Sequence, residues 1–427
     1  MDEKFIIQGG RPLKGEVKIR GAKNAAFPII AASLLTKEDC FIDNIPLIED
    51  VFKMLEIMEN IGAKVTWLGE RKIKLNCKDI DPLKLPFNII SRLRGSVLIL
   101  GPLLARFKEI KIVSPGGCVI GSRPIDTHLD ALSQSGVKIE QRGRFFYFNA
   151  KKEKEGKTEI VLSEFSVTAT ENILLFSSLK DKETILKIAD EDYQVQELIN
   201  VLIKMGAQLK SLGCHSFRIK GKRNLKGFSH KIIPDPIEAG TFIVASLITK
   251  GKVLVKNAGT PFLTLFLRKL EKSGAVLKVL KDDSVKVFPS SNLKIEKIQS
   301  SIYPGIHSDL QPVLGVLATQ CKGPTLIHDP LYEGRLKYLE GLNKMGADIV
   351  FCDPHRAIVN GPSQLYRTEI PSLDLRAGAA LVIAGLAAKG KSILNNIYQI
   401  DRGYEKIEER LLLLGAEIKR QKETNNE

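Results

Sequence analysis

The sequence has few of the features that mark several large protein classes. Its longest uninterrupted apolar run, from Ala377 to Ala388, is shorter than the roughly 18–20 residues of a membrane-spanning helix. Its start, Met-Asp-Glu-Lys-Phe, lacks the basic and apolar regions of a secretory signal. The six cysteines are far apart and form no Cys-x-x-Cys pair, which disfavours disulfides and zinc sites. We therefore expect a soluble cytoplasmic protein that does not span a membrane.

Aromatic residues are also scarce, at 6% with the single tryptophan Trp67. The 64 basic and 49 acidic side chains give a net charge of +15, which suits nucleic acid, acidic membranes or small anionic substrates. Nucleic-acid binders usually gather their cations into a stripe with interleaved aromatics, whereas the densest charge run here, Lys151 to Lys157, mixes signs. The net charge alone does not decide between these partners. The cations at helix starts, described below, favour small anions over nucleic acid or a membrane.

The 427 residues contain a short pattern six times: the apolar end of a helix, a glycine, a small residue and a β-type tail. The six glycines, spaced 68 to 74 residues apart, are Gly62, Gly136, Gly206, Gly274, Gly346 and Gly415. A glycine at this position adopts a left-handed conformation that ends the helix, and a strand is expected to follow. The chain therefore contains six repeats of about seventy residues.

Each repeat also contains a second, more uniformly apolar helix, which we expect to be buried. These helices are predicted at Asn24–Leu35, Gly95–Phe107, Thr170–Leu179, Ala239–Ile248, Leu310–Ala318 and Ala377–Ala388. Short strands such as Lys111–Val113, Thr184–Leu186 and Lys252–Val255 lie between the helices. Each repeat is thus predicted to be a βαβαββ unit. An open solenoid is disfavoured because solenoid repeats have roughly 20–45 residues.

Two domains of three repeats follow, with a cleft between them and a division near residue 230. The stretch from Lys226 to His230 is the expected crossover.

Several buried helices begin with charged residues, namely Lys23 with Asn24, Arg92 with Arg94, Asp309, and Asp374 with Arg376. Cations oppose the helix dipole at this end unless an external anion binds there too. The alternative is a surface cation paired with a neighbouring carboxylate. The recurrence in several repeats favours an anion site, and Arg335 and Arg402 repeat the theme before the second helices of their units.

The loop from Pro115 to His128 has three glycines within six residues, with Cys118 among them and Arg123 nearby. Although a lone cysteine is usually a small buried residue, a glycine-rich loop is a poor place to bury one. We interpret this loop as a lid that carries a reactive thiol beside a cation.

Taken in order, these motifs resemble the UDP-N-acetylglucosamine 1-carboxyvinyltransferase family over essentially the whole chain. The most specific part is Gly-Gly-Cys followed by Arg-Pro-x-Asp, from Gly116 to Asp126. The resemblance implies an inside-out α/β barrel, the enolpyruvyl transferase fold, with the N-terminal strand joining the C-terminal domain. The implied domains are residues 22–230, with the Cys118 loop, and residues 1–21 plus 231–427. It also implies enolpyruvyl transfer from phosphoenolpyruvate to the sugar 3′-hydroxyl, with release of phosphate.

The family's residue roles transfer to matching positions. Cys118 would assist proton delivery and product release, and Asp309 would accept the hydroxyl proton; Lys23 and Arg402 complete the catalytic set. The implied phosphoenolpyruvate ligands are Lys23, Arg94, Cys118, Arg123, Arg335, Arg376 and Arg402. The implied nucleotide-sugar ligands are Asn24, Arg94, Arg123, Pro124, Ile125, Asp126, His128, Ser166, Asp309 and Leu331. The resemblance implies no metal or cofactor, a monomer, and a fosfomycin-sensitive enzyme of the first committed step of peptidoglycan synthesis.

Three stretches depart from the family's pattern: Gly305 to Asp309 where Phe-Pro-Thr-Asp is usual, Glu191 to Val195 where Glu-Pro-Glu-Val is common, and Pro234 to Glu238 where Pro-Asp-Arg-Ile-Glu is common. These departures leave open an acceptor that is another nucleotide or sugar. A non-catalytic nucleotide-sugar sensor is a second alternative and an RNA-binding protein a third. The shikimate-pathway enzyme is disfavoured by the loop and its cysteine.

Overall fold

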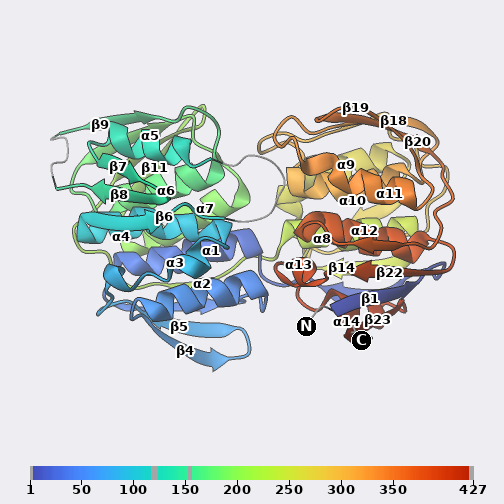
Figure 1. Cartoon of the computed structure of the whole chain (residues 1–427), viewed down its shortest axis with the longest axis horizontal. Helices are drawn as coiled ribbons and strands as arrows, with labels where there is room; N and C mark the ends of the chain where they lie inside the picture. The colour runs from blue at the N-terminus through green and yellow to red at the C-terminus, as the bar shows by residue number, and fades with distance from the viewer. Residues whose placement is uncertain (1–2, 117–123, 152–155, 423–427) are drawn as a thin grey trace. The chain divides into compact units, whose positions relative to one another are not determined.

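The computed structural model describes residues 3–116, 124–151 and 156–422 (Figure 1). Within them the chain forms two compact units. The N-terminal unit comprises the described residues of 21–233, and the C-terminal unit comprises residues 3–20 and 234–422. The predicted crossover at Lys226–His230 runs into a strand of the N-terminal unit, and the division falls after Ile233.

The N-terminal unit contains three sheets, in the orders β13-β3-β5-β4, β6-β8-β7 and β11-β12-β10-β9. Its helices are α1 (Lys23–Ala32), η1 (Ser33–Leu35), α2 (Glu49–Asn60), η2 (Pro82–Lys84), α3 (Phe87–Ile90), η3 (Arg94–Ile99), α4 (Leu100–Phe107), α5 (Asp126–Gln134), α6 (Val167–Ser178) and α7 (Tyr193–Met205). Its strands are β3 (Asp39–Asp43), β4 (Lys64–Gly69), β5 (Lys72–Asn76), β6 (Glu109–Val113), β7 (Lys138–Arg142), β8 (Phe145–Asn149), β9 (Thr158–Val161), β10 (Glu183–Lys187), β11 (Gln208–Gly213), β12 (Ser216–Lys220) and β13 (Ser229–Lys231).

The C-terminal unit also contains three sheets, in the orders β15-β16-β14-β2, β17-β18-β20-β19 and β21-β22-β1-β23. Its helices are α8 (Pro236–Ile248), η4 (Thr260–Leu263), α9 (Thr264–Lys272), η5 (Ser308–Leu310), α10 (Gln311–Ala318), η6 (Arg335–Lys337), α11 (Tyr338–Lys344), α12 (Leu375–Ala387), α13 (Tyr398–Asp401) and α14 (Ile407–Leu413). Its strands are β1 (Glu3–Gln8), β2 (Lys14–Lys18), β14 (Lys252–Lys256), β15 (Leu277–Val279), β16 (Val285–Val287), β17 (Lys297–Gln299), β18 (Gly323–His328), β19 (Asp348–Asp353), β20 (Arg356–Gly361), β21 (Glu369–Pro371), β22 (Lys391–Asn395) and β23 (Glu417–Lys422).

The six repeat glycines behave as the sequence predicts. All six have positive φ, between 86° and 105°, and each is followed within a few residues by a strand. A side chain is strained in this conformation, whereas glycine adopts it freely, so each of these helices stops at the same point of its repeat. The sixfold repeat is confirmed.

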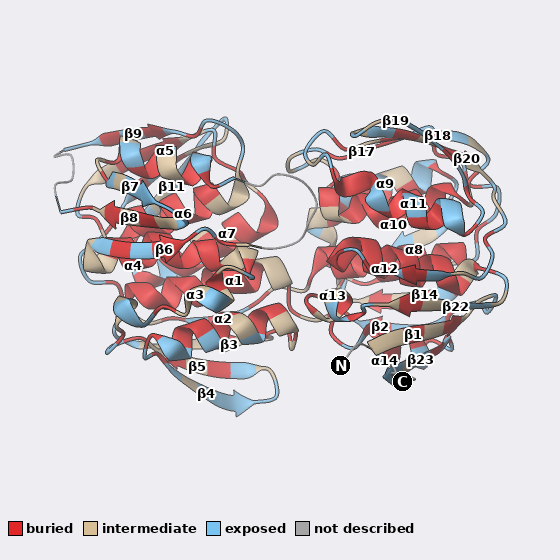
Figure 2. Ribbon diagram, in the orientation of Figure 1, coloured by how far each residue is buried: buried red, intermediate tan, exposed pale blue. Residues whose placement is uncertain are grey.

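The six apolar helices are the buried centres of the two units. All the residues of α8 and α10 are buried, as are most of α1, α4, α6 and α12. Figure 2 shows these helices in red inside each unit, with the sheets and their exposed residues toward the outside. In five sheets an edge strand runs parallel to its neighbour and the remaining pairs are antiparallel, as a βαβαββ unit requires.

The second repeat departs from this pattern. Within the described residues its sheet has three strands, β6, β7 and β8, and all three follow η3 in the chain. The strand that should precede the buried helix of this repeat is missing from the residues that the structure describes. The segment that would supply the strand contains Pro82 and Pro86 and forms η2 and α3 instead. Proline lacks a backbone N–H and cannot donate to a sheet ladder, which explains the difference from the predicted unit.

The first repeats of the two units have exchanged a strand, so that the strand preceding the buried helix of each repeat belongs to a sheet of the other unit. Strand β2, which precedes α1 in the chain, pairs in parallel with β14, whereas β13, which precedes α8, pairs in parallel with β3. The N-terminal strand β1 lies between β22 and β23, opposing Phe5 to Leu394 and Arg420. The C-terminal unit is therefore built from both ends of the chain.

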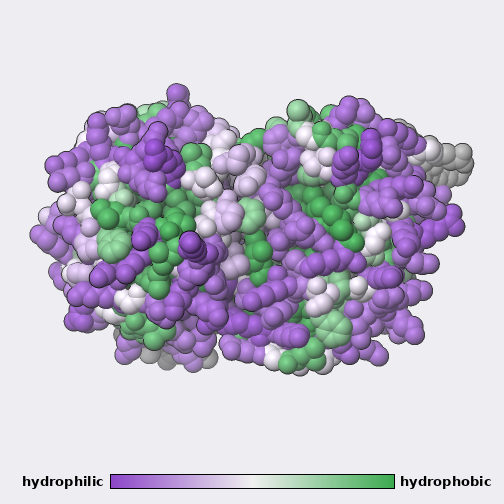
Figure 3. Space-filling model, turned by 180° about the vertical axis from the view of Figure 1, so that it is seen from behind, coloured by the Kyte–Doolittle hydropathy of each residue, from purple (hydrophilic) through white to green (hydrophobic). Residues whose placement is uncertain are grey.

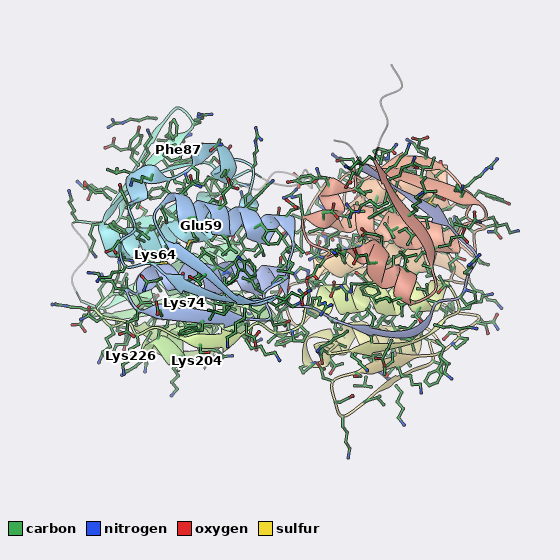
Figure 4. All side chains as sticks on the ribbon, turned by 90° about the horizontal axis from the view of Figure 1, so that it is seen from below. Glu59, Lys64, Lys74, Phe87, Lys204 and Lys226 are labelled. Carbon is green, nitrogen blue, oxygen red and sulfur yellow. The ribbon has the colours of Figure 1, made fainter. Side chains whose placement is uncertain are left out.

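Hydrophilic residues cover most of the face in Figure 3. Exposed lysines lie on separate elements, such as Lys64 on β4, Lys204 on α7 and Lys226 before β13 (Figure 4). Among the described helices, none has the length and apolar character to cross a membrane.

Candidate active site

Asp309 is the centre of a charged cluster in the C-terminal unit. It lies in η5, before the buried helix α10, and accepts hydrogen bonds on both carboxylate oxygens. Arg335 donates from Nη2 to Oδ1 at 3.0 Å, and Arg376 donates from Nε to Oδ2 at 3.0 Å. Only 4% and 3% of the two arginine side chains are exposed. Three separate predicted site residues are thus brought into direct contact.

The electrostatics of the cluster keep Asp309 ionised. Burial raises the pKa of its carboxyl group, but the positive charges of Arg376 and Arg335 lower that pKa. Their effect prevails, so the pKa lies well below its usual value. Burial likewise disfavours the charge of Arg335, but Asp309, Asp374 and Asp329 together outweigh that effect and raise the pKa of the guanidinium. The free carboxylate is therefore a weak base.

Asp329 is linked to this cluster through the hydroxyl of Ser308. It is fully buried, and its Oδ2 accepts hydrogen bonds of 2.7 Å from the hydroxyls of Ser300 and Ser308. The Ser308 oxygen in turn accepts the Nε–H of Arg335 at 3.0 Å. A buried carboxylate thus orients Arg335 through a hydroxyl. The predicted ligand Leu331 is 41% exposed, and its backbone N–H donates to Asp329 Oδ1.

The start of α12 and the segment after α13 complete the C-terminal cluster. Asp374 caps α12 by accepting the backbone N–H groups of Arg376 and Ala377 at 2.8 and 3.0 Å. The Arg376 guanidinium lies 5.2 Å from the centre of the Tyr404 ring. Arg402 is buried and donates from Nη1 to Gln399 Oε1 at 3.0 Å.

In the N-terminal unit, Lys23 is the first residue of α1 and Asn24 the second. Lys23 Nζ lies 2.7 Å from Asp50 Oδ2 at the start of α2, and both side chains are largely buried. Asn24 is half-buried. Helix α1 packs against η3, whose first residue is Arg94.

The predicted nucleotide-sugar ligands of this unit gather around α5 and α6. Arg94 Nη2 donates to the carbonyl oxygen of Pro124 at 3.0 Å. Ile125 is buried and Asp126, the first residue of α5, is exposed. His128 is 2% exposed; its Nε2 lies 3.0 Å from the hydroxyl of Thr168, two residues after Ser166.

His128 and Ser166 have defined roles in this packing. Burial lowers the pKa of His128 to about 3, and the nearby Arg94 contributes, so the imidazole is neutral. Ser166 caps α6, because its hydroxyl oxygen accepts the backbone N–H of Ala169 at 3.3 Å.

The sequence left open that the cations at the helix starts are surface residues paired with neighbouring carboxylates. They do have carboxylate partners, but these partners are not on the surface. Lys23, Arg335 and Arg376 face carboxylates that are themselves largely buried. An exposed ion pair contributes little to stability, and burying charge is costly, so this arrangement is poorly explained by stability alone. Cys118 and Arg123 lie outside the described residues.

The three departures from the family pattern all lie at helix starts. His307 precedes η5, and its Nδ1 accepts the backbone N–H of Asp309 at 2.9 Å. Asp192 caps α7. Asp235 caps α8, with Pro236 as the first helical residue, where a missing N–H has no cost.

Several polar residues that contact the predicted site were not singled out from the sequence. Asp50 and Asp329 have no local signal, because the side chains that they contact, those of Lys23, Ser300 and Ser308, are distant in the chain. Asn172 does have a local signal in the sequence, because it is a polar residue within the apolar helix predicted over Thr170–Leu179. In the structure it is fully buried. Its side chain contacts His128. In the described part of the chain, no three His, Cys, Asp or Glu residues are arranged to hold a metal ion.

Comparison with known proteins gives consistent results. The family model described as EPSP synthase (3-phosphoshikimate 1-carboxyvinyltransferase) matches residues 7–411. A Koribacter versatilis protein named UDP-N-acetylglucosamine 1-carboxyvinyltransferase is 40% identical over 98% of this chain and 96% of its own length. A Caldanaerobacter subterraneus protein, UDP-N-acetylglucosamine 1-carboxyvinyltransferase 1, is 40% identical over 98% of this chain and 100% of its own.

Among solved structures, the enolpyruvyl transferase NikO from Streptomyces tendae superposes with a TM-score of 0.89 at 24% identity, covering 98% of this chain and 99% of NikO. This likeness confirms the predicted fold class.

Proposed function

The chain belongs to the EPSP synthase family and, within it, to the UDP-N-acetylglucosamine 1-carboxyvinyltransferases, and from this premise we propose that it transfers enolpyruvyl from phosphoenolpyruvate to UDP-N-acetylglucosamine. The observation that carries the proposal is near-complete coverage at 40% identity with proteins of that name. The buried cation cluster around Asp309 supports it, because the donor substrate is a small polyanion.

The reaction has two steps. In the addition, the 3′-hydroxyl oxygen bonds to C2 of phosphoenolpyruvate, the C2=C3 electron pair takes a proton at C3, and the hydroxyl proton goes to a base. In the elimination, the bond from C2 to the phosphate oxygen breaks, phosphate leaves with the electron pair, and C3 loses a proton to restore the double bond. The enzyme must therefore accept the hydroxyl proton, deliver a proton to C3, remove a proton from C3 again and hold the departing phosphate.

The cations are proposed to bind phosphoenolpyruvate. Arg335 and Arg376 present buried guanidinium groups, which suit the planar carboxylate and the phosphate. Lys23, Arg94 and Arg402 are proposed to share this role with Arg123. Fixed positive charge stabilises the negative charge that develops on the leaving phosphate.

Asp309 is proposed to be the base that accepts the hydroxyl proton. In the free protein the two arginines hold its pKa low. When the two arginines also bind an anionic substrate, its negative charge offsets part of their effect on Asp309. The pKa of the carboxyl group then rises, and the carboxylate becomes a stronger base. The donor substrate would thus activate the base as it binds.

The nucleotide-sugar is proposed to bind along the starts of α1, α5 and α6. The proposed ligands are Asn24, Arg94, Arg123, Pro124, Ile125, Asp126, His128 and Ser166, with Asp309 and Leu331 from the C-terminal unit. We propose that Cys118 assists proton delivery to C3 and product release. The two units would be the two enolpyruvyl transferase domains, in a monomer that acts in the cytoplasm at the first committed step of peptidoglycan synthesis.

The test is phosphate release from phosphoenolpyruvate with a panel of acceptors: UDP-N-acetylglucosamine, UDP-N-acetylgalactosamine, other nucleotide sugars and shikimate 3-phosphate. We expect turnover with UDP-N-acetylglucosamine and none with shikimate 3-phosphate. Turnover with another nucleotide sugar alone would favour the second candidate, a paralogue with a different acceptor. The departures at His307, Asp192 and Pro236 motivate that candidate.

A further inference from the structure

Asn172 is a fully buried amide in the middle of α6, and its three hydrogen bonds fix its orientation. Its Oδ1 accepts the backbone N–H of Gly101 at 2.7 Å, and its Nδ2 donates to the carbonyl of Val97 at 3.0 Å. A backbone N–H only donates and a carbonyl only accepts, so a flipped amide would lose both bonds. The second hydrogen on Nδ2 points to Nδ1 of His128 at 3.0 Å.

This orientation determines where His128 carries its proton. Because an N–H donor faces Nδ1, that nitrogen must be the acceptor, and the neutral ring carries its hydrogen on Nε2. Burial, with a contribution from Arg94, lowers the pKa of His128 to about 3, which excludes the doubly protonated ring at neutral pH. The Asn172 amide thus selects one tautomer.

The tautomer in turn fixes the role of the Thr168 hydroxyl. Nε2 of His128 lies 3.0 Å from Thr168 Oγ1, so the ring donates and the hydroxyl oxygen accepts. The hydroxyl cannot then donate its own hydrogen to the ring, which leaves that hydrogen available to another acceptor. Thr168 is half-buried, in the first turn of α6 beside the proposed ligand Ser166.

We propose that Asn172 is a positioning residue for the nucleotide-sugar: through His128 it keeps the Thr168 hydroxyl as a hydrogen-bond donor toward an acceptor oxygen of the bound UDP-N-acetylglucosamine. Asn172 does not touch the substrate in this scheme, and Thr168 does. The inference rests on the proposed function, and it adds two residues that the family resemblance did not supply.

The tautomer is tested without substrate. In ¹⁵N-histidine-labelled protein at pH 7, His128, assigned by comparison with His128→Asn, should show a bare Nδ1 and a protonated Nε2. In Asn172→Leu, which has no donor opposite Nδ1, the ring should lose this fixed pattern. A protonated Nδ1 in the unaltered protein would overturn the proposal, whatever the enzyme's substrate.

The role in binding is tested by steady-state kinetics. Thr168→Val should raise the KM for UDP-N-acetylglucosamine by about fivefold, the effect of one hydrogen bond, while kcat and the KM for phosphoenolpyruvate stay unchanged. Asn172→Leu should shift the same KM in the same direction. In the double variant, the KM should equal that of Thr168→Val, because Asn172 acts through the missing hydroxyl. Thr264→Val, at an exposed threonine of α9, is the matched control and should change nothing.

The outcomes separate the two proposals. No turnover of UDP-N-acetylglucosamine by the unaltered enzyme would contradict the proposed function and leave the tautomer result standing. Normal turnover with additive KM effects in the double variant, or equal shifts in the KM for both substrates, would contradict the role of Asn172. Thermal unfolding of each variant checks its fold. Should Asn172→Leu not fold, an unchanged KM in Thr168→Val would still overturn the proposal.

Discussion

Arg376 donates from Nε to Oδ2 of Asp309 at 3.0 Å, although the two residues are 67 positions apart in the chain. Each lies at the start of a buried helix, α12 or α10, in successive repeats of the C-terminal unit. The repeat thus places equivalent helix starts side by side. The contact keeps the carboxylate ionised and brings two buried guanidinium groups, those of Arg376 and Arg335, to the same carboxylate.

Replacing Asp309 by Asn should separate binding from proton transfer. The amide retains an oxygen that can accept from one arginine but cannot accept the hydroxyl proton, so we expect kcat to fall by about 10²- to 10⁴-fold. The KM for phosphoenolpyruvate should not rise, because the arginines remain. Steady-state kinetics measure both values. Asp282→Asn, an exposed substitution, is the control; a kcat within twofold of the unaltered enzyme in Asp309→Asn would refute the assigned role.

Asp309 should also make stability depend on acid pH. Its folded-state pKa lies below the unfolded value of about 3.9, so its stabilising effect is present above about pH 4 and is lost as pH falls toward the folded pKa. Urea unfolding at pH 7 and at pH 3 should show a larger loss of unfolding free energy in the unaltered protein than in Asp309→Asn. Equal losses in the two proteins would contradict the ion-pair interpretation.

Many of the charged site residues of both units could be predicted from the sequence because the repeat marks them. Lys23, Arg94, Asp309 and Arg376 are found by their place at the start of a helix, which depends only on local pattern. What the sequence does not reveal is which side chains pair with one another in the folded chain. Asp329 reaches Arg335 through Ser308, and no local spacing predicts that contact.

Cys118 should be required for turnover and dispensable for folding. We expect Cys118→Ala to lose nearly all phosphate release while its thermal unfolding midpoint stays unchanged. The epoxide fosfomycin should alkylate the thiol of the unaltered protein, detected as a mass increase, and bound substrates should slow this reaction. Cys352→Ala, at an exposed cysteine, is the control for general thiol effects. Full activity of Cys118→Ala would rule out its catalytic role.

The repeat glycines give a prediction that is independent of function. A Cβ at Gly206 would meet no atom within 4 Å, yet the residue has a φ of 105°. Gly206→Ala should therefore lower the unfolding free energy by about 1–2 kcal/mol through backbone strain alone. Gly69→Ala, which also meets no atom but has no positive φ, should stay within about 0.5 kcal/mol. Equal effects in urea unfolding would argue against strain.

In the fold, too, features set by local sequence could be predicted, whereas contacts between distant segments could not. Helix ends and buried helices follow from glycine placement and apolar runs, and the structure has them within a few residues of the predicted positions. The missing strand of the second repeat was foreseeable from Pro82 and Pro86. The exchange of β2 and β13 was not, because the two strands have similar local sequences and only the packed sheets decide which neighbour each one joins.

The place of β1 in the sheet β21-β22-β1-β23 has a consequence for the order in which the chain folds during synthesis. The strands of the N-terminal unit are all encoded between residues 21 and 233, so this unit can be completed while the ribosome is still translating. In the part of the chain that the structure describes, β1 pairs with β22 and β23 alone, and the residues opposite Phe5, Leu394 and Arg420, are made about 390 and 415 positions later. Residues that are made before the N-terminal unit are thus among the last to find their place, and the nascent chain carries β1, with the core residues Phe5 and Ile7, unpaired until β22 and β23 have been made.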